Sequence, residues 1–209
     1  MTASNASAFR APTFVDLFGF GGNAALRPER AKTNEIGLQW AQGTSLLRVV
    51  AFHTKYEDAI TFSAGLVRNV RKASVEGYEA SYKGVLAGFD VRAALTLQDP
   101  VEQEPNAQEL PAIRRAKVYG SLAAYRAFGQ WRAGAELLSS GPRADTDIVS
   151  GVRVQNGGYS AVNLTARYQI DKKMYAAFRL ENVFNEDYQL IPGYNTPRRG
   201  AFVSVGYQP

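Results

Sequence analysis

Few side chains in this 209-residue chain belong to the types that most often catalyse reactions. Cysteine is absent, which excludes thiol nucleophiles, disulfides and Cys-ligated zinc. The one histidine, His53, has no neighbouring serine and aspartate arrangement, although Asp58 lies on the same run. Glu136 and Glu181 are more simply explained as hydrated charges than as an acid/base pair. We therefore expect no enzyme activity.

Metal and nucleic-acid binding are also poorly supported. Asp145 and Asp147 lie close together, but a calcium loop of the helical type needs further oxygen ligands, a glycine and a distal glutamate. The net charge is +5 and the pI about 9.4, yet the basic residues are scattered and form no cluster typical of nucleic-acid binding. We expect no metal, no cofactor and no nucleic-acid partner.

The elements that must position any site are strands, because apolar residues recur at every second position. Val203 and Val205 alternate with Ser204, and Val162 and Leu164 alternate with Asn163. In the segment 45–57 the phase of the alternation is ambiguous, because either of two alternating sets of residues could form the apolar side. The pattern predicts strands at 31–41, 45–62, 66–84, 88–99, 112–127, 130–141, 158–170, 173–184 and 198–207, with the remnant of a tenth at 2–9.

The lengths of these strands and of their connections favour a membrane barrel over the alternative, a large soluble β-sandwich. Soluble strands usually have about 5–6 residues, whereas tilted membrane strands need about 9–11. Short turns at 41–44, 85–89, 128–130 and 171–173 alternate with long polar loops at about 99–111, 141–157 and 187–197, as in outer-membrane barrels. Six aromatic residues near strand ends suit an interfacial girdle: Trp40, Tyr82, Phe128, Trp131, Tyr168 and Tyr207.

The end of the chain resembles the terminal hairpin of TonB-dependent outer-membrane receptors. Its "ENVFNEDYQLIPGYNTPRRGAFVSVGYQP" contains the family's N-[LV]-F-[ND]-x-x-Y pattern at Asn182, Phe184, Asn185 and Tyr188. Further segments resemble family motifs in the same order: "FRAPTFVDLFG" (9–19), "NAALRPERAKTNEIGLQW" (23–40), "NVRKASVEGYEASY" (69–82) and "LPAIRRAK" (110–117). The resemblance implies residence in the bacterial outer membrane and a role in transport.

The resemblance also suggests a ligand. "FGFGGNAALRPE" and "LPAIRRAK" look most like the cobalamin branch of the family, in which Arg114 sits where ligand is contacted. An iron–siderophore complex is the alternative, because such complexes are often anionic and arginines border the long loops. We take Arg114, Arg115 and Arg143 as the candidate ligand-binding residues, and the loop 142–157 as a second ligand-facing segment. Arg114 and Arg115 could instead face lumen water or lipopolysaccharide phosphates.

The resemblance covers only part of such a receptor, which is a barrel of about 22 strands around a plug. We therefore interpret residues 1–209 as the C-terminal part of the barrel, with the plug and the TonB box absent. Outer-membrane lipid and lipopolysaccharide are expected partners, and TonB only through the absent parts. The expected fold is all-β: an antiparallel, open and curved sheet of about nine or ten long strands. A small, self-closing passive pore is the alternative.

Overall fold

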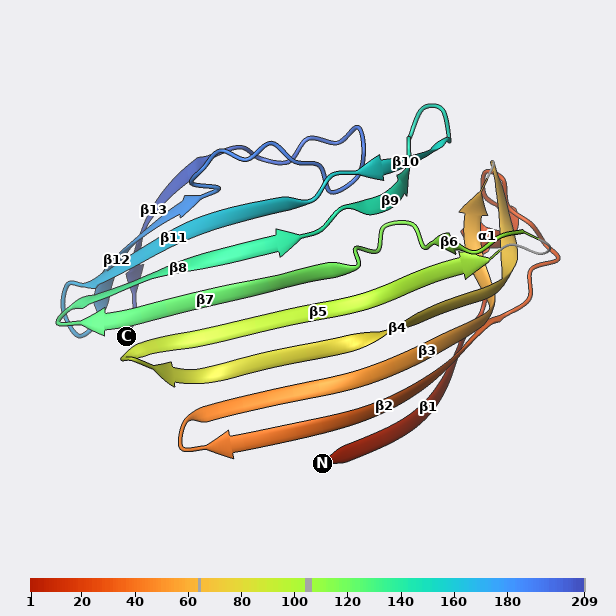
Figure 1. Cartoon of the computed structure of the whole chain (residues 1–209). Coiled ribbons are helices and arrows are strands. Elements are labelled where there is room, and N and C mark those ends of the chain that lie inside the picture. Colours follow the sequence, from red (N-terminus) through yellow and green to blue (C-terminus); the bar gives the residue numbers. More distant parts are fainter. Residues whose placement is uncertain (64, 104–106, 209) are drawn as a thin grey trace.

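The computed structural model describes residues 1–63, 65–103 and 107–208, and these form one long, twisted and curved sheet (Figure 1). The only helix in these ranges is short. The elements are β1 (Thr2–Arg10), α1 (Phe14–Phe18), β2 (Glu29–Gln42), β3 (Ser45–Ser63), β4 (Leu66–Leu86), β5 (Phe89–Gln103), β6 (Leu110–Pro111), β7 (Val118–Phe128), β8 (Trp131–Ser140), β9 (Arg143–Thr146), β10 (Arg153–Asn156), β11 (Tyr159–Gln169), β12 (Met174–Glu181) and β13 (Gly200–Tyr207). No helix among the described residues is long and apolar enough to cross a membrane.

The strands pair almost entirely in sequence order, and the pairings among the described residues are antiparallel. The order in the sheet is β1-β2-β3-β4-β5-β7-β8-β11-β12-β13, with β6 beside β5, while β9 and β10 form a separate hairpin. Two-residue turns join several neighbours. At Ala87–Gly88, both residues have positive φ (50° and 80°), which matches the primed turns that suit the twist of a hairpin.

The two outer strands of the sheet do not meet. Within the described residues, β1 pairs only with β2 and β13 pairs only with β12. The all-β, antiparallel and open architecture predicted from the sequence is therefore confirmed. Of the two segments that could form the first edge, 2–9 and 31–40, the structure has the first one there as β1, and β13 forms the last edge. The self-closed small barrel is not formed.

Register sorts the side chains into two faces, because residues directly opposite in neighbouring strands point to the same side. One, the apolar face, carries the following residues of β2, β3, β5, β7, β8, β11, β12 and β13: Ile36, Leu38, Leu47, Val49, Leu95, Leu97, Leu122, Leu137, Val162, Leu164, Phe178, Leu180, Val203 and Val205. The pairing of Leu38 with Val49 also decides the ambiguous phase of segment 45–57. The predicted aromatic girdle lies on this face at its short-turn end, where the rings of Trp131 and Tyr168 are 4.8 Å apart.

The opposite side, the polar face, carries Arg92, Glu136, Arg167, Arg179 and Glu181. Ion pairs on this face reach across an intervening strand: Arg132 of β8 lies 3.2 Å from Asp90 of β5. Such contacts are possible where side chains converge on the inside of a curved sheet. The loops also fold toward this face, since Arg153 of β10 contacts Glu102 of β5 at 3.0 Å.

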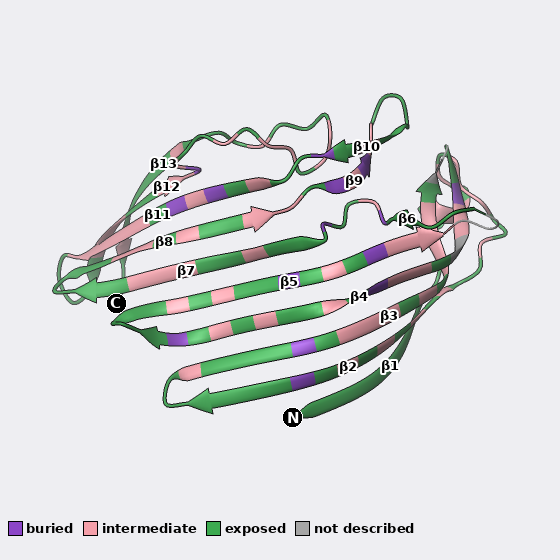
Figure 2. Ribbon diagram, in the orientation of Figure 1, coloured by how far each residue is buried: buried purple, intermediate pink, exposed green. Residues whose placement is uncertain are grey.

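A single curved sheet leaves little room for a hydrophobic core. Fully buried apolar residues are few and scattered among the described residues, and many large apolar side chains of the apolar face are exposed (Figure 2). Val203 is 77% exposed and Val205 is 67% exposed. An exposed apolar patch of this extent indicates contact with lipid or protein rather than water.

Three parts of the chain differ from the sequence prediction. The strand predicted at 112–127 begins only at Val118, because Arg114 adopts a positive φ of 60° and the preceding backbone bonds elsewhere. The predicted loop 142–157 contains the hairpin of β9 and β10. The strand predicted at 88–99 continues to Gln103, and residues 104–106 of the predicted loop 99–111 lie outside the described residues.

Candidate ligand-binding site

All three predicted arginines line one hollow on the polar face at the long-loop end of the sheet. Arg114, Arg115 and Arg143 border a cavity of about 680 Å³. Its floor and walls come from the ends of β5, β7, β8 and β11, and include Thr96, Gln98, Tyr119, Ser121 and Tyr159. Cationic, hydroxyl and aromatic groups therefore meet at one place, although the arginines are up to 29 residues apart in sequence. We call this hollow the arginine hollow.

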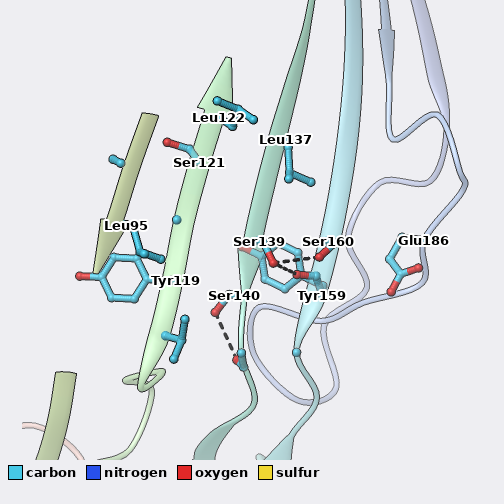
Figure 3. Close-up of a pocket in the computed structure, with 15 residues that line it drawn as sticks. Leu95, Tyr119, Ser121, Leu122, Leu137, Ser139, Ser140, Tyr159, Ser160 and Glu186 are labelled. Carbon is cyan, nitrogen blue, oxygen red and sulfur yellow. Dashed lines mark hydrogen bonds between the residues drawn. The ribbon is translucent and has the colours of Figure 1, made fainter. Parts of the chain in front are cut away.

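A second hollow of about 620 Å³ lies at the same strand ends but on the opposite, apolar face of the sheet (Figure 3). Leu122 of β7, Leu137 and Ser139 of β8, and Ser160 of β11 line it, and the register puts all four on the face of Leu95. The hydroxyls of Ser139 and Ser160 lie 2.8 Å apart and link β8 to β11. The strands that carry the arginine hollow on one face are thus also linked by a side-chain hydrogen bond on the other face.

The segment 112–117 places Arg114 and Arg115 at the hollow by attaching its small residues to β5. The backbone N–H of Ala112 donates to the carbonyl of Pro100 at 2.8 Å, and the side chain of Gln98 donates to the carbonyl of Ala116 at 2.8 Å. Ala112 and Ala116 are both buried. With the alanines against the sheet, the two arginines between them are left exposed.

Arg114 is attached to the β9 strand at two points. Its backbone N–H donates to the carbonyl of Ala144 at 2.7 Å, and its Nε donates to Oδ1 of Asp145 at 3.0 Å. About half of the Arg114 side chain remains exposed. Within the described residues its two Nη groups have no hydrogen-bond partner, so they are available to an anion.

Asp145 is the buried partner that orients Arg114. Its side chain has no exposed surface, and its Oδ1 also accepts a bond from the backbone N–H of Thr146 at 2.8 Å. Its Oδ2 is buried without a hydrogen-bond partner in the part of the chain described. A buried carboxylate with an unpaired oxygen is costly. The arrangement depends on Arg114, the cation beside it.

Arg143 and Arg115 make different contacts from Arg114. Arg143 is buried, and its Nη2 donates to the carbonyls of Gln189 at 3.1 Å and Leu190 at 2.7 Å. Arg143 therefore joins β9 to the loop that follows β12. Arg115 is exposed, and its guanidinium lies 5.8 Å from the ring centre of Tyr56 on β3, within cation–π range. The role of all three in ligand binding stays a prediction.

The sequence reasoning did not identify the aromatic pair beside the hollow. Tyr159 stacks on Tyr188 with ring centres 4.2 Å apart and an interplanar angle of 15°. In the alternation of its strand Tyr159 falls on the side opposite Val162 and Leu164, and Tyr188 closes the N-V-F-N-x-x-Y motif. The alternation of residues 159–169 was the available signal, but their contact depends on how the loop folds back.

The remaining candidates for chemistry are used in local contacts. Asp147 accepts bonds from the backbone of Val149 and from the backbone and hydroxyl of Ser150, and the backbone bond from Ser150 is the main cause that lowers the pKa of this carboxyl. His53 contacts Glu76 at 2.9 Å on the face opposite the hollow. The residues that the structure describes contain no group of three His, Cys, Asp or Glu side chains able to hold a metal.

Comparisons with known proteins agree with this fold. The family model described as TonB-dependent receptor-like, β-barrel, matches residues 2–185. The ferric-catecholate import receptor Fiu from E. coli K12 superposes with a TM-score of 0.80 at 20% identity, over 98% of this chain and 32% of that one. The pyoverdine receptor FpvA from Pseudomonas aeruginosa PAO1 bound to pyoverdine superposes with a TM-score of 0.79 at 20% identity, over 99% of this chain and 33% of that one.

The copper transporter OprC is similar to the same extent, with a TM-score of 0.79 at 16% identity over 98% of this chain and 37% of that one. This chain therefore spans about a third of the length of the solved structures that it matches. At these identities the likeness concerns the fold.

Proposed function

Since the chain belongs to the TonB-dependent receptor β-barrel family, whose members are transport receptors of the Gram-negative outer membrane, we propose that it forms the C-terminal part of a barrel that takes up an iron–siderophore complex. On this proposal, residues 1–209 are one part of a larger receptor. The energy for uptake comes from TonB, through regions other than these strands.

The arginine hollow is the observation that carries the ligand proposal. It lies on the polar face, which becomes the lumen of a barrel, at the end where the long loops gather. The free Nη groups of Arg114 and the exposed guanidinium of Arg115 suit an anionic ligand, because arginine binds planar oxygen-rich anions through paired hydrogen bonds. The aromatic rings of Tyr119 and Tyr159 add flat apolar surface beside these charges.

An iron–siderophore ligand has better support than cobalamin. The resemblance to the cobalamin branch depends on two short motifs, whereas the relatives described above include a ferric-catecholate receptor and a pyoverdine receptor with the same fold over 98–99% of this chain. Cobalamin lacks the strong negative charge that the hollow is arranged to meet. We therefore propose the siderophore ligand as the function.

The open sheet supports a part of a larger barrel over a passive pore. An exposed sheet edge leaves backbone groups without hydrogen bonds, and each costs several kcal/mol in lipid. β1 and β13 both present such an edge among the described residues. Further strands must complete the barrel before it can lie in a membrane.

Direct binding measurements on the receptor test this proposal. A ferric-catecholate complex, a ferric-pyoverdine complex, Cu²⁺ and cobalamin would be titrated into the protein extracted from outer membranes, with intrinsic fluorescence as the readout. We expect saturable binding of a ferric complex and a lower affinity for it in Arg114→Ala, with Lys173→Gln at the short-turn end as the matched control. Binding of cobalamin alone, or of Cu²⁺ alone, would overturn the siderophore proposal.

A further inference from the structure

Two lysines on the apolar face stand directly opposite each other with no acid to neutralise them. Lys32 of β2 pairs in register with Lys55 of β3, and both are exposed. Neither makes an ion pair with any residue that the structure describes. Like charges directly opposite in an antiparallel pair, with Cβ atoms about 4.5–5.5 Å apart, are destabilising. Their juxtaposition therefore calls for an anion from outside these residues.

The neighbouring strands show that the chain can neutralise such pairs where it needs to. Glu76 of β4 stands opposite Asp99 of β5 on the same face. Glu76 contacts His53 at 2.9 Å, and Asp99 contacts Lys117 at 2.5 Å. The acidic pair thus has a histidine and a lysine of the chain itself as partners, and the lysine pair has no such partner among the described residues.

More positive charge surrounds the lysine pair. Arg30 and Lys72 are diagonal neighbours of Lys55, and both stand opposite Glu57 in register. With four cations and one carboxylate, these five residues carry a formal charge of +3. Arg30, Lys32, Lys55 and Glu57 border a hollow of about 590 Å³, together with Phe9, which is 78% exposed. We call this set of residues, with Lys72, the basic patch.

The height of the basic patch matches the headgroups of a lipid layer. Ile36 and Leu38 lie on the same face, and they are 56% and 61% exposed. Lys32 is four residues from Ile36 toward the long loops, which is about 13 Å along an extended strand. Apolar side chains below and long cationic side chains above are the arrangement that lets lysine reach the polar boundary of a membrane.

We propose that the basic patch binds the phosphate groups of a phosphorylated glycolipid in the outer leaflet, with Lys32 and Lys55 sharing one phosphate. The apolar residues below it receive the acyl chains of the same molecule. The site is separate from the arginine hollow, because it lies on the opposite face of the sheet. It does not depend on which ligand the receptor transports.

Native mass spectrometry of the protein extracted from outer membranes in mild detergent tests the site. Bisphosphorylated lipid A, its dephosphorylated form and inorganic phosphate would each be titrated. Each lysine beside an anionic lipid surface contributes about a fivefold gain in affinity. We therefore expect the double variant Lys32→Gln/Lys55→Gln to bind bisphosphorylated lipid A about 25-fold more weakly than the unaltered protein, and no such difference for the dephosphorylated form.

Two further variants keep the test decisive. Lys32→Arg/Lys55→Arg retains the charge and should retain binding, which separates loss of the site from loss of folding. Lys83→Gln removes a lysine from the polar face and should bind lipid A as the unaltered protein does. Equal binding by the double glutamine variant would overturn the proposal. So would inorganic phosphate binding as tightly as the lipid, because the site would then bind free phosphate rather than lipid.

Discussion

Arg114 donates from Nε to Oδ1 of Asp145 at 3.0 Å, and the two residues differ sharply in exposure: about half of the Arg114 side chain reaches solvent, while that of Asp145 is completely buried. The pair joins the segment before β7 to the β9 strand. The exposed Arg114 faces the arginine hollow, and the buried Asp145 holds Arg114 in place.

Removing Arg114 should destabilise the β9–β10 hairpin more than removing Asp145. Arg114→Ala leaves a buried carboxylate without its cation, which costs about 1–3 kcal/mol, whereas Asp145→Asn leaves an arginine that water can solvate. Hydrogen exchange of residues 143–156 in the two variants measures the difference. In the double variant the loss should be smaller than the sum of the single losses, since the residues interact directly. Strict additivity would contradict the coupling.

Arg115 should contribute to ligand affinity with little effect on the loops. Its side chain is exposed, and its guanidinium lies over the ring of Tyr56. Loss of one hydrogen bond to a charged ligand costs about 1.5–3 kcal/mol, so Arg115→Ala should weaken binding of a ferric complex by at least about tenfold. Arg143→Ala should instead release the loop at 189–190, because its bonds go to carbonyls there. Fluorescence titration and hydrogen exchange, measured on both variants, distinguish these effects.

Two neighbouring residues of β13 should differ in their tolerance of a charge. Val203 lies on the apolar face and Ser204 on the polar face. Arginine on the lipid side of a membrane strand costs about 2–4 kcal/mol near the middle of the bilayer, so Val203→Arg should reduce assembly into the outer membrane. Ser204→Arg serves as the matched control and should assemble normally. The quantity of folded protein in isolated membranes is the measurement, and equal yields would refute the assignment of faces.

The turn at Asp147 should loosen in acid. Bonds from the backbone and hydroxyl of Ser150 and from the backbone of Val149 lower the pKa of this carboxyl from its ordinary value of 3.8. The stabilisation is therefore complete above that value and is lost as the pH falls through the lower pKa of the folded protein. After correction for intrinsic rates, hydrogen exchange of the Ser150 amide should be constant from about pH 5 to 8. Below about pH 4 the corrected rate should rise above that constant value. Asp147→Asn should remove this dependence.

Residues 1–209 alone should not form channels. The edges at β1 and β13 are unpaired among the described residues, and open edges favour aggregation in water and are excluded from lipid. Refolded protein added to planar bilayers should therefore give no discrete conductance steps. Reproducible channels of one size would show that the two edges can close on each other, and would favour the passive pore.

The positions of most strands could be predicted because alternation is a local property of extended backbone. Val203 and Ser204 take opposite faces whatever lies beside them, and short turns containing Gly43 or Gly88 determine where neighbouring strands reverse. The beginning of β7 could not be predicted in this way. "LPAIRRAK" continues an alternating pattern, but Arg114 has a positive φ and its backbone N–H bonds to Ala144 of β9, so the regular pairing of β7 with β5 begins only at Val118.

By itself the sequence determined the all-β class, the two faces of most strands and the arginine-bearing ends of the long connections, since each follows from a period of two and from the length of each run. Only the tertiary structure decided the phase of segment 45–57, through the pairing of Leu38 with Val49. It alone joined Arg114 to Asp145 across 31 residues and set Lys32 opposite Lys55. These contacts depend on strand register and on loop packing, and neither of these produces a periodic pattern of residues in a single sequence.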